Sequence, residues 1–526
     1  MEQEINIKQL KPKDRKNGYP LNVPKWYIRI FEILPGAITW FFILSPFILT
    51  LLGLTELLIL HISFLTIYWS YRCIRFLVGL IIGVNRMKRD IDTDWVGKIK
   101  KLKGKPREIN KNLKYLLVCP IVSEGMEILK PTLDAWAKSD INSKKISLVV
   151  AAEERFQEQA KENYKKIEKI YKGKFREIMF FIHPNDIEGE VMGVKGPNIN
   201  WATRKFVKKV KARGEKIKDY LLISCDSDLQ PHPKYLSAIT YKYLTDSKRE
   251  RRFYATAVHT FNNNIWRVPP IVRVQSMFLT IVILHDWVVR RWAKDTFSSY
   301  VVNLNCVDCV HYWDPEIGID DTTFYWNSLV RFEGDFSGRE IYIPTYSDAV
   351  ENATVIKTHI SLYKQQLRWG WGIIVFPLTF AALYKNKAIS RIKKLSIAWQ
   401  LIDNQLLFLT VIYSITFALP ILNIINPEYR YSAASYNLPV LMSYIFTGLM
   451  FLNLPIVFLR RKITPVPKNW NIFRHIYDIL ETGLIVVNML TFAFIPFVQA
   501  QSELLFGKGF RKRYYSTEKV QIARKK

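Results

Sequence analysis

Cysteine is scarce in this sequence, with five residues in a chain of 526. The cysteines fall in segments that the hydropathy pattern assigns to membrane or cytosol, where disulfide frameworks are not expected. The five are Cys73, Cys119, Cys225, Cys306 and Cys309. Cys306 and Cys309 lie close to His311, but a structural zinc site usually has four ligands and no second cysteine pair is present. We therefore interpret them as buried or incidental cysteines.

The first 27 residues lack the short apolar core and small-residue cleavage site of a signal peptide, so we expect the first apolar block to act as a signal anchor. The sequence also lacks any nucleic-acid recognition motif. Its formal net charge is nevertheless +30 at pH 7. We attribute this charge to the Lys and Arg excess of cytosolic loops, which anionic inner-leaflet lipid attracts, and not to nucleic-acid binding.

Long apolar blocks crowd the two ends of the chain, whereas residues 85–363 resemble a soluble protein. Crossing a bilayer core takes roughly 20 mostly apolar helical residues, and several blocks reach that length. The blocks are residues 33–52, 56–84, 396–425, 438–459 and 472–505. The pattern predicts a multi-pass integral membrane protein, with the plasma membrane as the expected location.

The distribution of Lys and Arg predicts the orientation, because basic residues collect on the cytosolic side. They are abundant in the N-terminal tail, after the second block and in the loop at 459–470, so we expect the soluble domain to face the cytosol. We predict the following segments: a basic cytosolic tail (1–32), two transmembrane helices (33–84), the cytosolic domain (85–363), an interfacial helix (364–395), C-terminal transmembrane segments (396–505) and a basic cytosolic tail (506–526).

The last apolar block, 472–505, does not fit a single span. One further crossing would place the basic C-terminal tail outside, against the positive-inside tendency. Asp478 and Glu481 lie in its first turns and Pro496 near its end. We therefore expect a re-entrant or broken helix, or a tight pair of spans.

Between residues 113 and 260, short β-branched runs alternate with Lys-rich helical stretches, which indicates a Rossmann-like α/β domain with a mostly parallel sheet. The predicted strands are 114–122, 145–152, 177–182 and 219–225. Ligands of such sheets bind beyond the carboxyl ends of the strands. The polar residues found there are Ser123 and Glu124, then Glu153 and Glu154, then the loop at 183–202, and finally Asp226 and Asp228.

Asp226 and Asp228 follow the fourth predicted strand directly. Residues i and i+2 of an extended segment point the same way, so both carboxylates can face one cation. Hard oxygen ligands suit Mg²⁺ or Mn²⁺, which bind through one or two carboxylates together with substrate phosphates. The pair therefore predicts a metal site that takes a diphosphate. The alternative is that both are solvated turn residues.

Six sequence features occur in the order found in membrane-embedded family-2 glycosyltransferases, the superfamily of cellulose, chitin and hyaluronan synthases. They are "PIVSE" at 120–124, the acids at 153–154, "GVKGPNIN" at 193–200, "DSD" at 226–228, and "WDPEIGIDD" at 313–321 followed by "QQLRW" at 365–369. The chain resembles that family over residues 115–370. The resemblance implies a GT-A-like catalytic domain inserted between transmembrane helices.

The resemblance also implies a donor site for a nucleotide-diphosphate sugar. Asp226 and Asp228 would hold the metal on the diphosphate, and Glu153 or Glu154 would contact the nucleobase or ribose, with the choice between them open. The other residues that the resemblance places at the nucleotide sugar are Glu124, Lys195, Asn200, Gln365 and Arg368. Independently of the resemblance, Arg368 suits the charge that builds on a departing diphosphate.

The acceptor side is implied in the same way. The family's Thr-Glu-Asp motif falls on Ile319, Asp320 and Asp321, so Asp321 would be the catalytic base and Asp320 would point elsewhere. Trp369 would line the acceptor site. Two alternatives stay open: Asp321 could cap a helix that begins near Thr322, and the Arg and Trp of "QQLRW" could be an interfacial anchor.

The function that follows is inverting transfer of a sugar, from a UDP-sugar by preference, to a polysaccharide, with Mg²⁺ or Mn²⁺ as cofactor and membrane lipid as a partner. Single displacement needs no enzyme nucleophile, and none stands out. The alternatives are non-processive transfer to a lipid-linked acceptor, or a catalytically inactive membrane scaffold of the same fold.

Overall fold

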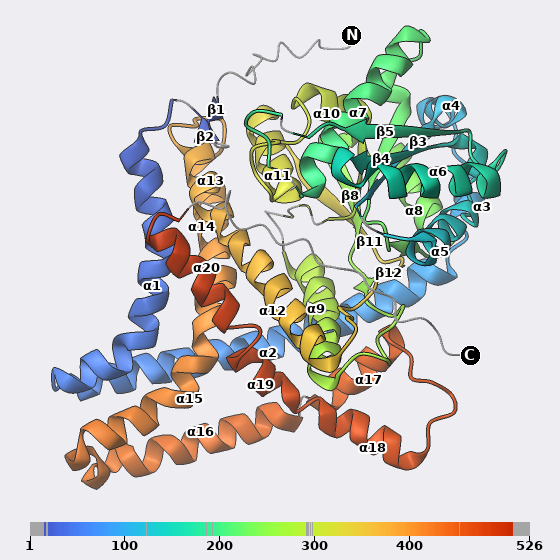
Figure 1. The fold of residues 1–526 in the computed structure, drawn as a ribbon. Helices are drawn as coiled ribbons and strands as arrows, with labels where there is room; N and C mark the ends of the chain where they lie inside the picture. The colour runs from blue at the N-terminus through green and yellow to red at the C-terminus, as the bar shows by residue number, and fades with distance from the viewer. Residues whose placement is uncertain are drawn as a thin grey trace.

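The computed structural model describes residues 15–16, 19–20, 22–122, 124–185, 187–191, 193–290, 294, 296, 298–451 and 453–508. Ser123 and most of both predicted basic tails lie outside these residues. The described chain forms an α/β domain next to a group of long helices (Figure 1).

The domain is built on a seven-stranded sheet in the order β11-β8-β10-β6-β3-β4-β5. The four predicted strands are confirmed, and they pair in parallel. They are β3 (Lys114–Ile121), β4 (Ile146–Glu153), β5 (Glu177–His183) and β6 (Tyr220–Ser224). The chain runs outward from β3 through β4 to β5 and returns to the other side of β3 for β6. The switch point is therefore between β3 and β6, where such sheets open a binding crevice.

Three further strands complete this sheet on the β6 side. β10 (Tyr300–Asn303) runs antiparallel to both of its neighbours, and β11 (Ser337–Ile341) runs parallel to β8 (Arg252–Thr256). A small three-stranded sheet joins β7 (Gln230–Pro231), β12 (Thr345–Tyr346) and β9 (His259–Thr260). A two-stranded ribbon, β1 (Arg15–Lys16) with β2 (Tyr19–Pro20), precedes the helices.

Successive side chains of β3 point to opposite faces of the sheet and therefore pack in two different cores. Tyr115 and Leu117 pack in a core with α5, α6 and α8, whereas Leu116 and Val118 pack in a core with α7, α10 and α11. Both faces of the sheet are thus covered. The helices around the domain are α3 (Trp95–Lys100), α4 (Lys105–Asn112), α5 (Met126–Ala137), α6 (Gln157–Tyr171), α7 (Lys195–Ala212), α8 (Tyr235–Thr245), α10 (Leu304–Cys309) and α11 (Asp320–Arg331).

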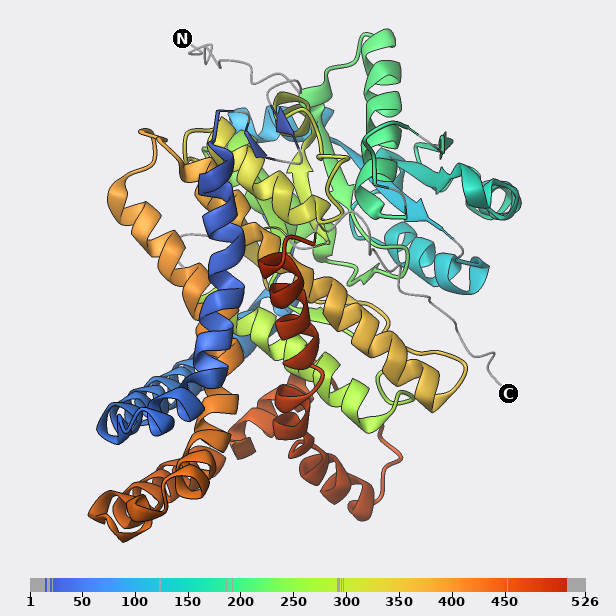
Figure 2. The same ribbon diagram turned by 60° about the vertical axis from the view of Figure 1, so that its left-hand side comes forward.

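The remaining helices form the second part of the molecule (Figures 1 and 2). Within the described residues, five stretches are long and apolar enough to span a membrane: Lys25–Leu51, Thr55–Asp92, Pro270–Val289, Arg391–Ile425 and Ile472–Leu505. The helices of this part are α1 (Lys25–Leu51), α2 (Thr55–Asp92), α9 (Pro270–Val289), α12 (Val355–Gly370), α13 (Val375–Leu383), α14 (Arg391–Ile402), α15 (Phe408–Ile425), α16 (Ala433–Phe451), α17 (Asn453–Ile463), α18 (Ile472–Glu481), α19 (Leu484–Leu490) and α20 (Ile495–Leu505).

Helix α9 lies inside the stretch that the sequence assigned to the soluble domain. It packs against α2 and α19, and 67% of its most apolar 18-residue segment is buried within the protein. Arg273 and Gln275 interrupt its apolar run, which is why the sequence did not stand out as a membrane block. The predicted block at 472–505 consists of three short helices, α18, α19 and α20, with breaks after residues 481 and 490.

The end of α2 is fastened to the sheet. Asp90 is buried and accepts a hydrogen bond from the backbone N–H of Tyr342, which follows β11 (3.1 Å). The Arg86 guanidinium donates to the Tyr342 hydroxyl (2.7 Å). The long helix is therefore held directly to the α/β domain and not through a flexible linker.

Candidate active site

The two aspartates that follow β6 have different hydrogen-bond partners. The Asp226 carboxylate accepts a hydrogen bond from the Lys195 ammonium (3.1 Å). Asp228 is buried, and its carboxylate accepts one from the backbone N–H of Asp348 (3.2 Å). Because the switch point of the sheet lies beside β6, both carboxylates stand at the crevice that the fold predicts.

Lys195 begins α7 and brings a positive charge to these acids. Its ammonium donates to Asp226 and to the carbonyl of Ser298 (2.5 Å). Burial disfavours the charged lysine, but the negative charges of Asp226 and Asp320 outweigh burial and raise the pKa of Lys195. The lysine is therefore charged and lies between two groups of acids.

Asp320 and Asp321 form the second acidic pair, in the first turn of α11. Asp320 is buried against the start of α7, where a Cβ atom on Gly196 would lie 2.7 Å from the Asp320 Cβ. Burial and the charge of Asp321 raise the pKa of Asp320 to about 7. Burial also raises the pKa of Asp321. Glycine at 196 is what lets the two helix starts approach so closely.

One sequence-based interpretation of this pair is wrong. Helix α11 begins at Asp320 and its N-cap is Ile319, so Asp321 is not the cap; its carboxylate accepts from the N–H of Thr322, the next residue (2.8 Å). Asp320 interacts electrostatically with Asp321, Lys195 and Asp226. Asp321 also interacts electrostatically with Lys195 and Asp226.

Glu124 supports the loop that carries the aspartates. Its carboxylate accepts hydrogen bonds from the Ser227 hydroxyl (2.9 Å) and from the backbone N–H of Val122 (2.6 Å). Ser227 stands between the two aspartates. The glutamate thus ties the end of β3 to the turn after β6, across the switch point.

The acids after β4 have different surroundings. The carboxylate of Glu153 is buried and pairs with Arg155 (2.6 Å). Glu154 accepts from the backbone N–H of Asn185 (2.8 Å), in the loop that follows β5. Arg155 also reaches that loop, since a Cβ atom on Gly193 would lie 3.1 Å from its guanidinium. Both acids therefore help to hold the loop that ends at Lys195.

Asn200 has both ends of its side chain occupied. Its amide donates to the carbonyl of Trp313 (2.8 Å), and its oxygen accepts from Arg204 (2.6 Å). It anchors the "HYWDP" loop, whose His311 and Tyr312 have left-handed φ angles of 62° and 70°. Non-glycine residues in this conformation cost energy and persist only where the surroundings hold them. Asn200 is thus one of the groups that positions this strained loop.

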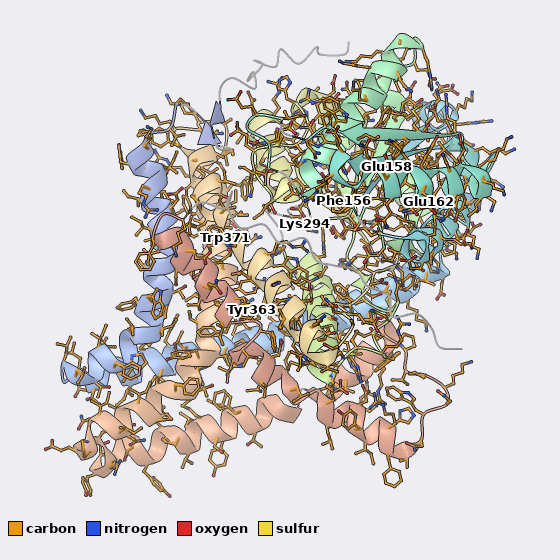
Figure 3. The ribbon with its side chains drawn as sticks, in the orientation of Figure 1. Phe156, Glu158, Glu162, Lys294, Tyr363 and Trp371 are labelled. Atoms are coloured by element: carbon orange, nitrogen blue, oxygen red, sulfur yellow. The ribbon has the colours of Figure 1, made fainter. Side chains whose placement is uncertain are left out.

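The "QQLRW" motif lies on α12, which begins at Val355, nine residues before the predicted boundary at 364. Gln365, Arg368 and Trp369 are partly exposed. Figure 3 shows Tyr363 on the same helix, and its hydroxyl donates to Gln499 of α20 (2.6 Å). The motif helix therefore lies where the α/β domain meets the long helices.

One residue of the motif, to which the sequence assigned no role, is buried. The Gln366 side chain accepts a hydrogen bond from the Gln275 amide of α9 (3.0 Å), and Gln275 in turn accepts from Asn488 of α19. All three are buried. This network holds α12 to two other helices, and glutamines on separate apolar helices give no sequence signal of pairing.

His259 is a second residue that the sequence did not indicate. It lies on β9 and interacts electrostatically with both Asp226 and Asp228. Burial lowers its pKa, while the two carboxylates oppose that effect. The short strand "HT" lies outside the four apolar runs, so the sequence offered no reason to place it beside the aspartates.

The residues of this site fit a divalent cation that also binds substrate phosphates and water. Within the described residues, no group of three or more His, Cys, Asp and Glu side chains converges as a metal site. Asp226 and Asp228 offer hard carboxylate oxygens on one loop. Mg²⁺ and Mn²⁺ commonly bind through one or two carboxylates plus substrate phosphates and water, and this pair meets that requirement.

The sequence matches no protein-family model, and no curated protein sequence matches it. Among solved structures, the chain is similar to a mannosyltransferase of Pyrobaculum calidifontis, described in complex with GDP-Man and Mn²⁺, with 11% identity and a TM-score of 0.43 over 82% of this chain and 99% of that one. It is also similar to residues 1–349 of S. aureus TarS, with 9% identity and a TM-score of 0.31 over 76% of this chain and 93% of that one.

Proposed function

We propose that this protein is a membrane glycosyltransferase that moves a sugar from a nucleotide-diphosphate sugar, with UDP-sugars favoured, to a polysaccharide, with inversion. One observation carries the proposal. Acids from two different elements lie near the ammonium of Lys195: Asp226, two residues before Asp228, accepts a hydrogen bond from it, and Asp320 and Asp321 of α11 interact with it electrostatically. Transfer of this kind needs one set of groups for a diphosphate and another for a proton, and the site offers both.

The first pair suits the donor. Asp226 and Asp228 would hold Mg²⁺ or Mn²⁺, which supplies charge stabilisation to a departing diphosphate. Lys195 already bonds to Asp226, so its ammonium lies where a phosphate oxygen would approach. Glu124 keeps the aspartate loop in place through Ser227. Preorganised charges of this kind need little rearrangement during the reaction.

The second pair suits the acceptor. A hydroxyl that attacks the anomeric carbon must lose its proton, and a carboxylate within hydrogen-bond reach can take it. We assign this role to Asp321. Burial raises its pKa, which makes it a stronger base than a solvated aspartate. The same hydroxyl displaces the diphosphate in one step, so the anomeric configuration inverts without an enzyme nucleophile.

The long helices suit a membrane setting. Five stretches have the length and composition of spans. We propose that the stretches other than α9 insert in the plasma membrane and that the α/β domain faces the cytosol, where nucleotide sugars are found. Because β8 and β10, on either side of α9, pair in one sheet, α9 stays on the side of that domain. The acceptor would then approach from the helix side of the site, next to α12 and Trp369.

Release of nucleoside diphosphate from a panel of UDP- and GDP-sugars by the purified full-length protein tests this proposal. We expect release from at least one donor with Mn²⁺ or Mg²⁺ and its loss in excess chelator. The Asp228→Asn variant is the control for contaminating hydrolases and should release none. Absence of release from every donor, with and without added glycan or lipid extract, would favour an inactive scaffold; full turnover in chelator would refute the metal role.

A further inference from the structure

Helix α18 exposes its apolar side chains and buries its acids, which is the reverse of a surface helix in a water-soluble protein. Its large apolar side chains point outward, with exposed fractions of 66% for Ile472, 76% for Phe473, 47% for Ile476, 42% for Tyr477 and 70% for Leu480. Its two acids, Asp478 and Glu481, are buried. The apolar residues are spaced by one and by three to four positions, so they share one helical face. A contiguous exposed face of this kind marks an interaction surface.

The acids are buried because arginines from other helices bind them. Asp478 accepts hydrogen bonds from Arg460 (2.6 Å) and Arg461 (2.8 Å), at the end of α17. Glu481 accepts one from Arg273 of α9 (3.0 Å). The three ion pairs fix the rotation of α18 about its own axis. With its polar edge held inward, its apolar edge has to face away from the protein.

The length of α18 excludes a crossing by this helix alone. Ten residues at 1.5 Å each give about 15 Å, half of a bilayer core. The end of α17 and the loop after it are held by the segment between β9 and α9, where Asn262 donates to the carbonyl of Ile463 (3.0 Å) and Trp266 to that of Pro465 (3.1 Å). The helix therefore starts near the domain.

The rim of the apolar face carries the residues that favour a bilayer interface. The Arg474 guanidinium stacks on Trp470 (4.9 Å to the ring centre) and on Tyr477 (4.8 Å). Lys462 and Lys468 are exposed nearby in the chain. Aromatic rings and basic side chains collect at the headgroup level of membranes. Figures 1 and 2 place α18 below the α/β domain, together with the first turn of α12, whose Val355 and Ile356 are also exposed.

We propose that α18 is a lipid-docking helix. It lies in the plane of the bilayer surface, with the five apolar side chains at the boundary of headgroups and acyl chains and with Asp478 and Glu481 turned toward the arginines. This assignment rests on the membrane setting of the proposed function. It adds that the start of the block at 472–505 lies on the membrane and does not cross it.

Nitroxide labels on the full-length protein in phosphatidylcholine vesicles test the docking. Leu480→Cys and Phe473→Cys carry labels on the apolar face. Glu162→Cys carries one on α6, at an exposed position of the α/β domain (Figure 3). The signal of the parent chain, treated in the same way, accounts for its native cysteines. We expect oxygen to relax the labels at 473 and 480 more strongly than a water-soluble nickel chelate does, with the opposite order at 162.

Two results would overturn the proposal. One is nickel accessibility at 473 and 480 equal to that at 162, which would place the helix in water. The other is dipolar broadening between labels of two copies at low protein density, which would show that a second copy of the chain covers the face. Because collision rates need no turnover, a protein with lipid-buried labels and no sugar transfer would refute the proposed reaction and leave the docking intact.

Discussion

At the scale of single residues, the pairing of Asp320 with Asp321 distinguishes this site most clearly from a simple two-aspartate metal site. Burial and the Asp321 charge raise the pKa of Asp320 to about 7, against 3.8 for an ordinary aspartate. Between these two pH values the folded protein therefore binds more protons than the unfolded chain. The contribution of Asp320 to stability is largest below pH 4 and is lost as the pH rises toward 7.

The pH dependence of transfer follows from the same pair. We expect kcat/KM to fall on the acid side as the carboxylates take up protons. Because the charge of Asp321 raises the pKa of Asp320, Asp321 ionises first, while Asp320 is still neutral. Asp320→Asn keeps this position neutral, so an acid limb set by Asp321 should stay in place. The pH profiles of kcat/KM for the two proteins measure this. A limb that moves to lower pH would show that a charge on Asp320 opposes the ionisation of Asp321.

Glu124 is expected to act through the aspartate loop. Glu124→Gln weakens the hydrogen bonds to Ser227 and Val122, and bonds to charged groups contribute about 1.5–3 kcal/mol. We predict that donor affinity falls about tenfold or more. Ser227→Ala should give a smaller loss, and the double variant should lose less than the sum, because both substitutions remove the same contact. Strict additivity in a titration of donor binding would contradict this coupling.

At the scale of elements, the sequence predicted what depends on local pattern. The runs "LLVC", "LVVA", "MFFI" and "LLIS" are strands because a parallel strand covered on both faces is apolar throughout. The short strands β8, β10 and β11 carry weaker patterns and were not predicted. The apparent soluble character of residues 85–363 concealed α9, whose Arg273 and Gln275 have partners on α18, α12 and α19.

The sequence also predicted only part of the candidate site. Asp226, Asp228, Lys195 and Asp321 were predicted from motif order, and the structure brings them together. Asn200 holds a loop, because its side-chain amide donates to the backbone carbonyl of Trp313. Tertiary partners of this kind have no local signal in one sequence.

The buried amide network predicts a defect in the motif helix when Gln275 is changed. Gln275→Leu leaves polar groups of Gln366 and Asn488 without a bond, at about 1–3 kcal/mol for each buried group. We expect a lower Tm and a slower transfer, with donor affinity less affected. Thr280→Val is the matched control, since this buried hydroxyl of the same helix bonds to the Ser276 carbonyl one turn away (3.1 Å). Equal effects of the two substitutions would rule out a special role for the network.

At the scale of the whole molecule, the arrangement of the chain ends supports a cytosolic C-terminus. Arg29, near the start of α1, donates to the carbonyls of Leu504 and Leu505 at the end of α20 (3.1 and 2.5 Å). The start of α1 and the end of α20 thus lie together. Lys508→Cys should therefore resist a membrane-impermeant thiol reagent applied outside intact cells and react after permeabilisation. Labelling from outside would contradict the predicted topology.

In the proposed reaction, one pair of acids serves the donor and the other serves the acceptor. The most direct test measures nucleotide-sugar affinity and transfer rate in parallel for Asp228→Asn and Asp321→Asn. General-base assistance is worth about 10²–10⁴-fold. We predict that Asp321→Asn lowers the transfer rate by that order with donor affinity nearly unchanged, whereas Asp228→Asn abolishes metal-dependent donor binding. Near-normal transfer by Asp321→Asn, or a loss of donor binding as severe as that of Asp228→Asn, would contradict the account.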